Sequence, residues 1–417
     1  MTVCNPPIAL YRAGHSTETA LLRVHHDITC TLDKNRCAVL VMLDLSAAFD
    51  VIDHTVLRKG LEYSLGISGG ALQWLLSYLQ DRTQRIAIGA VLTDEFHLQC
   101  GVHQGSVLEH KLYCIFSNPI AEICRRHNMT YHFYTDDTQL YLVFETLENW
   151  IDISKRLEDC LTEISSWMCS NMLKLNENKT EVMLFAPKHR VKDLQYCHLT
   201  FGGNVVTRSE CVKNPGVYFD KTLSMNQQVS SVSKSCFHQI RNIGRIRPYI
   251  TENACKTLVS SLVNSRLDYG NALLYRLPAS VIQRLQRIQN TAAIVVTRRK
   301  KHDHITPTLE TLHWLPIHYR VQYKVLLYVF KALKQEAPLY LEELVNIYKP
   351  ARSLRSENNT TLVTPIVRTK SYGERRFDKA AASLWNDLPN ELRNIQSVNV
   401  FKKKLKTHFF RQAVLSF

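Results

Sequence analysis

Two adjacent aspartates, Asp136 and Asp137, interrupt an apolar and aromatic run that is otherwise typical of a buried β-strand. The run reads TYHFYTDDTQLYL from Thr130 to Leu142. An unpartnered carboxylate is costly to bury, and two neighbouring ones are more costly. The segment therefore predicts a strand, a tight turn carrying the aspartates, and a returning strand over 131–144. A solvated turn is the simplest alternative for an Asp-Asp pair, but the flanking apolar residues disfavour it.

Strand and helix patterns alternate along the first 220 residues. The run VLVMLDL, Val39 to Leu45, is typical of a buried strand and places Asp44 at its carboxyl end, before a helical pattern over 46–61. The remaining predicted elements are helices over 71–80, 106–128 and 147–172, a hairpin over 85–99 with TDE near its turn, and a strand over 181–185. Because hairpins occur among the alternating elements, an α+β sheet is favoured over a doubly wound one.

The remainder of the chain has a helical and strongly basic character. Helices are predicted over 279–296, 319–334 and 380–392, and the polar stretch 349–370 is the best candidate for a linker. Residues 1–220 carry 20 Lys and Arg against 25 Asp and Glu, whereas residues 221–417 carry 32 against 12. This asymmetry favours a nucleic-acid partner held by the second half. A basic surface kept only for solubility is the alternative.

The twelve cysteines contain no C-x-x-C pair, and none follows Cys255. Neither a zinc finger nor a disulfide framework is predicted, and reduced thiols in an intracellular protein are expected. No apolar run approaches the roughly 18–20 residues that a membrane-spanning helix needs, so no membrane partner is expected. Residues 1–10 do not have the pattern of a signal peptide.

Three acidic residues are predicted at strand ends or turns: Asp44, Asp136 and Asp137. Magnesium prefers a few carboxylates together with phosphate oxygens of a substrate. Two such ions about 3.5–4 Å apart can activate a 3′-hydroxyl and stabilise a leaving pyrophosphate. These residues are therefore candidates for a divalent-metal site, and the segment alone leaves a solvated turn open as the alternative.

Five motifs occur in a fixed order around these acids: VMLDLSAAFDVIDH (41–54), GVHQGSVL (101–108), FYTDDTQLY (133–141), LKLNENKTEVMLF (173–185) and VKNPGVYFDKTL (212–223). In this order they resemble the reverse transcriptase of non-LTR (LINE-type) retrotransposons, particularly the jockey-like group. YRAGHSTETALLRV (11–24) and the C-terminal HWLPIHYRVQYKVLLYVFKAL and AAASLWNDLPNELR are also similar to segments of that family. The resemblance covers nearly the whole chain.

The resemblance implies two Mg²⁺ ions, with Mn²⁺ as a possible substitute. Asp44 and Asp136 would bind both ions, the carbonyl of Leu45 would complete one coordination shell, and Asp137 would give close support. Phe49 would crowd a ribose 2′-hydroxyl and so favour deoxynucleotides, although a packing role alone is the alternative.

Further residues are implied to contact substrates. Gln104 and Gly105 would lie beside the nascent base pair, and Lys179 would serve the departing pyrophosphate. Arg12 would lie near the incoming nucleotide or the template, and Gly216 with Val217 would grip the primer end. For Lys179 and Arg12 a solvated surface position is the alternative.

The implied fold is α+β: a right-hand polymerase palm with partial fingers, followed by an α-helical thumb and a C-terminal helical region. The predicted boundaries are 1–38 for the partial fingers, 39–220 for the palm, 221–300 for the thumb and 301–417 for the basic C-terminal helical region. The implied partners are an RNA template, a DNA primer and dNTPs, and the implied compartment is the nucleus.

The sequence also departs from the family pattern. No segment corresponds to the family's endonuclease or outermost fingers motifs, which predicts an N-terminally truncated copy. Unusual residues stand at His103, Glu109, His110, Pro215 and Ile294. We therefore expect an RNA-directed DNA polymerase domain, with a catalytically inactive remnant that only binds nucleic acid as the alternative. A two-metal nuclease is disfavoured by Phe49, by Gln104-Gly105 and by Lys179.

Overall fold

The computed structural model describes residues 14–46, 49–134, 137–145, 149–176, 179–192, 194, 197–206, 208–300, 303–349 and 360–415. The chain divides into two compact units. The first contains the described residues of 37–184 and 189–209, and the second contains those of 13–36, 185–188 and 210–417. The division into two compact units does not identify fingers, palm or thumb. The boundaries predicted for these subdomains and for the C-terminal region therefore stay predictions.

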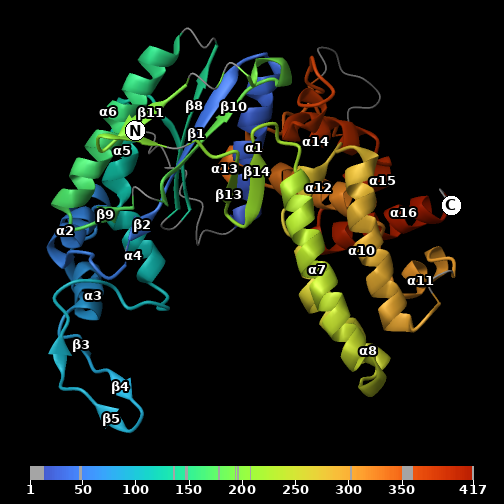
Figure 1. Cartoon of the computed structure of the whole chain (residues 1–417), viewed down its shortest axis with the longest axis horizontal. Coiled ribbons are helices and arrows are strands. Elements are labelled where there is room, and N and C mark those ends of the chain that lie inside the picture. Colours follow the sequence, from blue (N-terminus) through green and yellow to red (C-terminus); the bar gives the residue numbers. More distant parts are fainter. Residues whose placement is uncertain are drawn as a thin grey trace. The chain divides into compact units, whose positions relative to one another are not determined.

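A four-stranded sheet with the order β10-β1-β8-β7 forms the centre of the first unit (Figure 1). Its strands are β1 (Cys37–Leu43), β7 (Thr130–Tyr134), β8 (Asp137–Phe144) and β10 (Glu181–Phe185). Strand β8 pairs antiparallel with both β1 and β7. Six of the seven side chains of β1 are buried, as expected for a central strand covered on both faces. The predicted strand–turn–strand over 131–144 and the strand over 181–185 are confirmed.

Helices and short ladders surround this sheet. Helices α5 and α6 pack together beside it, and α5 also contacts β7 (Figure 1). The helices are α2 (His54–Lys59), the π-helical turn η1 (Gly60–Ser64), α3 (Gly69–Leu79), α4 (Glu109–Phe116), α5 (Asn118–Arg126), α6 (Trp150–Ser170) and the 3-10 turn η4 (Lys188–Arg190). The short strands are β2 (Leu45–Ser46), β3 (Thr83–Gln84), β4 (Ala87–Ile88), β5 (Val91–Leu92), β6 (Phe96–His97), β9 (Lys174–Leu175), β11 (Leu199–Phe201) and β12 (Asn204–Val206).

The predicted continuous helix over 46–61 is wrong. Ser46 belongs to β2, residues 49–51 form a turn, and α2 begins only at His54. Asp53 determines this start, because its carboxylate accepts the backbone N–H groups of Thr55 (2.6 Å) and Val56 (3.0 Å). The hydrogen bond from Val56 is the largest cause of the lowered pKa of Asp53.

The hairpin predicted over 85–99 is present, but TDE (93–95) does not lie at its turn. Strand β4 pairs with β5 across Gly89-Ala90, and β3 pairs with β6 further out. Gly89 has φ of +64°, a backbone conformation that favours glycine and so fixes the turn there. The arm extends away from the central sheet (Figure 1).

The second unit is mostly helical. Its helices are α1 (Thr17–Asp33), α7 (Asn226–Ile246), α8 (Glu252–Val259), α9 (Ser265–Asp268), α10 (Ala279–Thr297), α11 (Thr306–Thr311), α12 (Ile317–Leu333), α13 (Leu339–Glu342), α14 (Phe377–Asn386), α15 (Asn390–Arg393) and α16 (Val398–Leu415). Shorter turns are η6 (Arg247–Tyr249), the π-helical η7 (Ser260–Asn264), η8 (Asn271–Leu274) and η9 (Gly373–Arg375), and one hairpin joins β13 (Cys211–Asn214) to β14 (Val217–Asp220).

Proline and capping residues determine where many of these helices begin. Helices α10, α12, α13 and α15 each follow a proline, which pre-sets φ and needs no hydrogen-bond partner for a missing N–H. Helix α1 begins with a capping box in which Ser16 and Thr19 hydrogen-bond reciprocally. The single helix predicted over 380–392 is therefore two helices, α14 and α15, separated at Pro389.

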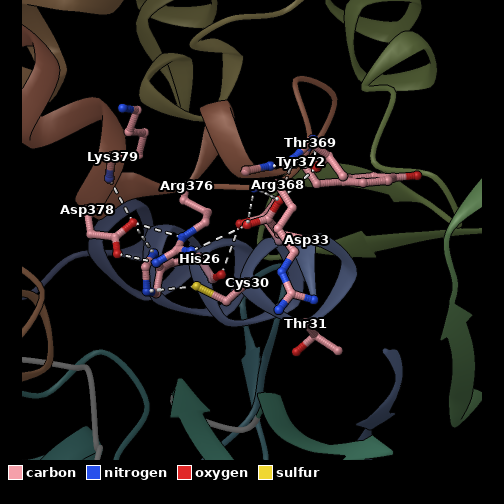
Figure 2. A network of polar contacts seen from close by, with 12 residues as sticks. His26, Cys30, Thr31, Asp33, Arg368, Thr369, Tyr372, Arg376, Asp378 and Lys379 are labelled. Atoms are coloured by element: carbon pink, nitrogen blue, oxygen red, sulfur yellow. Dashed lines mark hydrogen bonds and ion pairs between the residues drawn. The ribbon is translucent and has the colours of Figure 1, made fainter. Parts of the chain in front are cut away.

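The C-terminal segment docks on α1 through a buried polar cluster (Figure 2). Buried Asp33 accepts the backbone N–H groups of Arg368 (3.0 Å) and Thr369 (2.8 Å) and the hydroxyl of Thr369 (2.9 Å). Arg376 lies 3.5 Å from the other carboxylate oxygen of Asp33. The end of the predicted linker 349–370 is thus a packed part of this unit, while 350–359 lie outside the described residues.

A Cys–His–Asp row lies in the same cluster. Cys30 Sγ is 3.4 Å from His26 Nε2, and His26 Nδ1 is 3.7 Å from Asp378 Oδ1 (Figure 2). Burial raises the pKa of Cys30 to about 12, so its thiol stays protonated and is a poor nucleophile. We therefore interpret Cys30, His26 and Asp378 as part of the packed cluster and not as a catalytic triad.

The predicted α+β class is confirmed, with a sheet-containing first part and helices after about residue 220. None of the described helices is both long enough and apolar enough to cross a bilayer.

Candidate active site

The register of the central sheet brings the ends of β1 and β8 together. The β1–β8 ladder ends at the pair Leu43 and Thr138, so the next residues on the two strands are Asp44 and Asp137. Asp137 also closes the β7–β8 hairpin opposite Tyr134. Asp44 and Asp137 therefore meet at one end of the sheet, as the sequence predicted. Asp136 lies outside the described residues.

The carboxylate of Asp44 is incompletely satisfied. Its Oδ2 atom is buried and accepts no hydrogen bond within the described part of the chain. The Nζ atom of Lys179 lies 3.2 Å from this oxygen, close enough for an ion pair but without hydrogen-bond geometry. Lys179 is largely exposed, so the pair is weakened by water. A cation that approached the Oδ2 atom of Asp44 would therefore compete only with this exposed ammonium group among the described residues.

A short ladder holds Asp44, Leu45 and Lys179 in place. Strand β2 pairs with β9, and the backbone N–H of Asn176 donates to the carbonyl of Asp44 (3.0 Å). This bond makes Leu45 and Leu175 a non-hydrogen-bonded pair, so this ladder does not use the Leu45 carbonyl. The carbonyl of Asn176 in turn accepts the N–H of Lys179 (3.1 Å). Asn176 thus positions both partners of the ion pair, a role that sequence reasoning missed.

The oxygen atoms of the Asp44 carboxylate and the Leu45 carbonyl are of the kind that binds a divalent cation. Carboxylate and carbonyl oxygens are the ligands of magnesium, and the buried Oδ2 of Asp44 lacks a donor. Among the described residues, no group of three or more His, Cys, Asp and Glu side chains could hold a metal ion. The predicted set extends beyond them, because it includes Asp136 and the side chain of Asp137.

Phe49 lies in the turn before α2 and packs against two aromatic rings. Its centroid is 5.5 Å from that of His110 and 5.1 Å from that of Tyr113, both on α4. The Phe49 carbonyl accepts the N–H of Val102 (2.9 Å). Gly101 fits closely here, because a Cβ at this position would lie 2.7 Å from the carbonyl oxygen of Asp50. Phe49 is therefore held by the segment that leads to Gln104.

Gln104 and Gly105 are exposed on this segment. The Gln104 amide donates to Asp50 (2.9 Å), so Asp50 positions a predicted substrate-contacting residue. Gly105 has φ of +84°, and no protein atom lies within 4 Å of the place where its Cβ would be. The buried carboxylate of Glu109 accepts the Gly105 N–H. Glu109, unusual for the family pattern, is thus accommodated by a hydrogen bond that only its structural context reveals.

Gly216 and Val217 belong to the second unit, in the β13–β14 hairpin. Pro215 and Gly216 form its two-residue turn, so Pro215 removes no hydrogen-bond donor from the ladder. Gly216 has φ of +78°, and the Tyr269 hydroxyl donates to the Pro215 carbonyl (2.7 Å). The Val217 side chain is buried, which leaves its main chain for any contact with a primer.

The remaining predicted residue, Arg12, lies outside the described residues. Within the first unit, the structure brings Asp44, Leu45, Asp137 and Lys179 to one end of the sheet and joins Phe49 to the segment before Gln104. Asn176 follows LKL directly, and its place in the LKLNENKTEV motif is the one sequence signal that could have identified it.

Comparison with known proteins identifies similar chains. The profile of the family described as reverse transcriptase (RNA-dependent DNA polymerase) matches residues 2–219. The probable RNA-directed DNA polymerase from transposon X-element of Drosophila melanogaster is 24% identical over 69% of this chain and 31% of that protein. The RNA-directed DNA polymerase from mobile element jockey of the same species is 22% identical over 54% of this chain and 24% of that protein.

The chain spans less than a third of the length of these curated relatives. Among solved structures, a telomerase from Candida albicans in complex with a fragment of telomeric RNA gives a TM-score of 0.38 at 12% identity, over 72% of this chain and 50% of that one. This score is too low to establish a shared fold.

Proposed function

The chain belongs to the reverse transcriptase (RNA-dependent DNA polymerase) family, and on this premise we propose that it is the RNA-directed DNA polymerase domain of a non-LTR retrotransposon. The predicted resemblance to jockey-like elements is confirmed by relatives from mobile elements, jockey among them. The observation that carries the proposal is the buried Oδ2 of Asp44, which accepts no hydrogen bond from the described residues and belongs to the residue that follows the last β1–β8 pair.

Asp44, Asp136 and the Leu45 carbonyl hold two magnesium ions in this proposal, with Asp137 in close support. When bound, the ions supply charge stabilisation for the attacking and leaving oxygens of nucleotidyl transfer. The β2–β9 ladder supports this role, because it fixes the main chain of Asp44 without using the Leu45 carbonyl. The primer 3′-hydroxyl is the nucleophile, and pyrophosphate is the leaving group.

The side chain of Lys179 occupies two positions in this proposal, first beside Asp44 and then beside the pyrophosphate. In the protein alone its ammonium group lies beside Asp44 and partly neutralises it. With Asp44 engaged by metal, the Lys179 ammonium group would be released to the anionic pyrophosphate, which needs a positive partner or a proton as it leaves. The exposure of Lys179 supports such a movement, since few contacts restrain its side chain.

The other predicted residues act on substrate position. The open space at Gly105 supports close approach of a base pair, and Gln104 is oriented by Asp50. Phe49 excludes a ribose 2′-hydroxyl, with its ring supported by His110 and Tyr113. Arg12 contacts the incoming nucleotide or template, and the main chain of Gly216 and Val217 contacts the primer end.

The proposed partners are an RNA template, a DNA primer and dNTPs. The balance of 32 basic against 12 acidic residues over 221–417 supports binding of a polyanion by the second half. Such contacts go to phosphates and so fix position rather than sequence.

Primer extension tests this proposal. The purified chain is given an RNA template, an annealed DNA primer, dNTPs and Mg²⁺ or Mn²⁺. We expect extension that Asp44→Asn and Asp136→Ala each reduce by about a thousand-fold, because each removes several kcal/mol of charge stabilisation. Asp159→Asn, an equal change of charge on an exposed face of α6, should extend normally.

Two results would contradict this proposal. Extension that survives both substitutions would exclude this metal site. Absence of extension by the unchanged protein, with salt-sensitive binding of RNA or DNA retained, would establish the alternative of an inactive remnant that only binds nucleic acid.

A further inference from the structure

A cavity of about 510 Å³ lies within the second unit, and none of its lining residues is among the substrate or metal residues assigned above. Its wall is formed by η7, α9, η8, the loop before α12, α12 itself and Lys406 of α16. This volume is within the range that small organic ligands occupy in proteins. One wall contains the π-helical turn η7, a conformation that is rare and often found at functional sites.

Two carboxamide groups on this wall lack partners for their oxygens. Asn264 and Asn271 are 8% and 3% exposed, and the Oδ1 atom of each accepts no hydrogen bond within the described residues. The Nδ2 of Asn271 donates to Asp268 (3.3 Å), which orients its oxygen. A buried acceptor without a hydrogen-bond donor is destabilising. A ligand with N–H groups that donate to both oxygens would therefore bind favourably.

The same cavity has an excess of positive charge. Arg320 is paired with Asp268, and Lys324 is paired with Glu18 at 2.8 Å. Lys406 is the additional cation, with no carboxylate among the described residues within ion-pair distance. Burial, and then the charges of Arg320 and Lys256, lower the pKa of Lys406. An anionic group beside Lys406 would relieve this repulsion.

Aromatic and apolar side chains complete the lining. Trp314 and Tyr323 provide flat rings, with Leu315 and Leu327 beside them. Rings of this kind are the surfaces on which unstacked bases of single-stranded nucleic acids are held. The cavity thus combines a stacking surface, two acceptors and one unpaired cation.

We propose that this cavity binds one unstacked nucleotide of a single-stranded nucleic acid, with its phosphate at Lys406 and an exocyclic amino group at Asn264 and Asn271. The amino groups of adenine, cytosine and guanine each offer two N–H donors, which match two acceptors. Uracil and thymine offer a single ring N–H and leave one oxygen unpaired. The site therefore prefers bases that carry an amino group over uracil and thymine, and it does so whether or not the chain polymerises DNA.

Equilibrium binding to the full chain tests this inference. The probes are 5′-labelled single strands of about ten nucleotides, made of A, C or U as RNA and of A, C or T as DNA. We expect the A and C strands to bind about ten-fold more tightly than the U or T strands. Asn264→Leu with Asn271→Leu should abolish this preference while keeping or raising the urea midpoint, because unpaired polar groups are removed.

Lys406→Gln with Lys404→Gln gives a matched pair on α16. Both remove one positive charge, but only Lys406 lines the cavity. Lys406→Gln should weaken all strands by about five-fold and reduce the slope of log affinity against log salt by about one. Lys404→Gln should leave the base preference and most of the affinity unchanged. This pair decides the question even if the asparagine variants fold poorly.

Three outcomes would overturn the inference. Equal affinity of the unchanged protein for A and U strands would exclude recognition of an amino group. An unaltered preference in the double leucine variant would place that preference elsewhere. Displacement of the A strand by a poly-glutamate peptide at equal concentration would show a surface that binds anions in general. The RNA and DNA arms identify which strand supplies the nucleotide.

Discussion

Asp33 and Asp44 are both carboxylates at the end of a secondary-structure element, yet the two units treat them in opposite ways. In the second unit, three donors of Arg368 and Thr369 satisfy Asp33, and Arg376 balances its charge. In the first unit, Asp44 keeps a buried oxygen without a hydrogen bond and has one exposed lysine nearby. A saturated carboxylate stabilises its own fold, whereas an unsaturated one is available to a ligand.

The largest expected effect is on stability, from removal of Asp33. Asp33→Ala leaves the N–H groups of Arg368 and Thr369 without this acceptor and the largely buried Arg376 without one counterion, so we expect a loss of about 3–5 kcal/mol in the free energy of unfolding. Urea denaturation of the full chain measures it. A loss below about 1 kcal/mol would contradict the assignment of Asp33 as the anchor of the C-terminal segment.

A smaller effect is expected from acid, through His25 of α1. Burial, and then the charges of Arg375 and His26, hold the pKa of His25 well below its usual value. The unfolded chain takes up a proton at about pH 6.5 while the folded chain does not, so stability falls as pH decreases below that value. We expect a loss of about 1 kcal/mol per pH unit from this group, starting near pH 6.5.

His25→Gln should remove this part of the pH dependence, since glutamine does not titrate. His238→Gln, at an exposed site of α7, is the control and should keep it. Denaturation midpoints at about pH 7.5 and about pH 5.5 give the comparison. An equal change in the denaturation midpoint between the two pH values for both variants would show that His25 is not the group responsible.

The smallest expected effect is that of Asp44→Asn in the absence of metal. Because the half-exposed pair with Lys179 contributes little, we expect a change within about 0.5 kcal/mol. The unchanged protein should gain thermal stability on addition of Mg²⁺, and Asp44→Asn should gain much less. Equal gains for both proteins would remove Asp44 from the metal site, and a large loss without metal would make it a structural residue like Asp33.

Local patterns in the sequence predicted the strands that carry the acids. The run VLVMLDL is buried because its strand is central, and β7 and β8 pair as far as Tyr134 and Asp137, on either side of the predicted turn. Such features depend on neighbours in the chain, so a single sequence reveals them. The same reasoning failed at 46–61, because the cap formed by Asp53 decides where the helix begins.

Contacts between distant segments could not be predicted in this way. Nothing in TLD at 31–33 indicates that its aspartate accepts hydrogen bonds from residues 368 and 369, and nothing in EH at 109–110 indicates that Glu109 binds the Gly105 main chain. The sequence likewise gives no sign of the two asparagines of the cavity. Their carboxamide oxygens lack hydrogen-bond donors because of the packing around them, which depends on distant segments.

The docking of Arg368 and Thr369 on Asp33 has a consequence for synthesis of the chain. The partners are separated by 335 positions, so α1 leaves the ribosome long before the segment that satisfies its buried carboxylate. At translation rates of about 5–20 residues per second, that delay is on the order of tens of seconds. Until then the face of α1 that carries Asp33 lacks the C-terminal segment that covers it. We therefore expect this exposed face to be the binding site of a chaperone on the nascent protein.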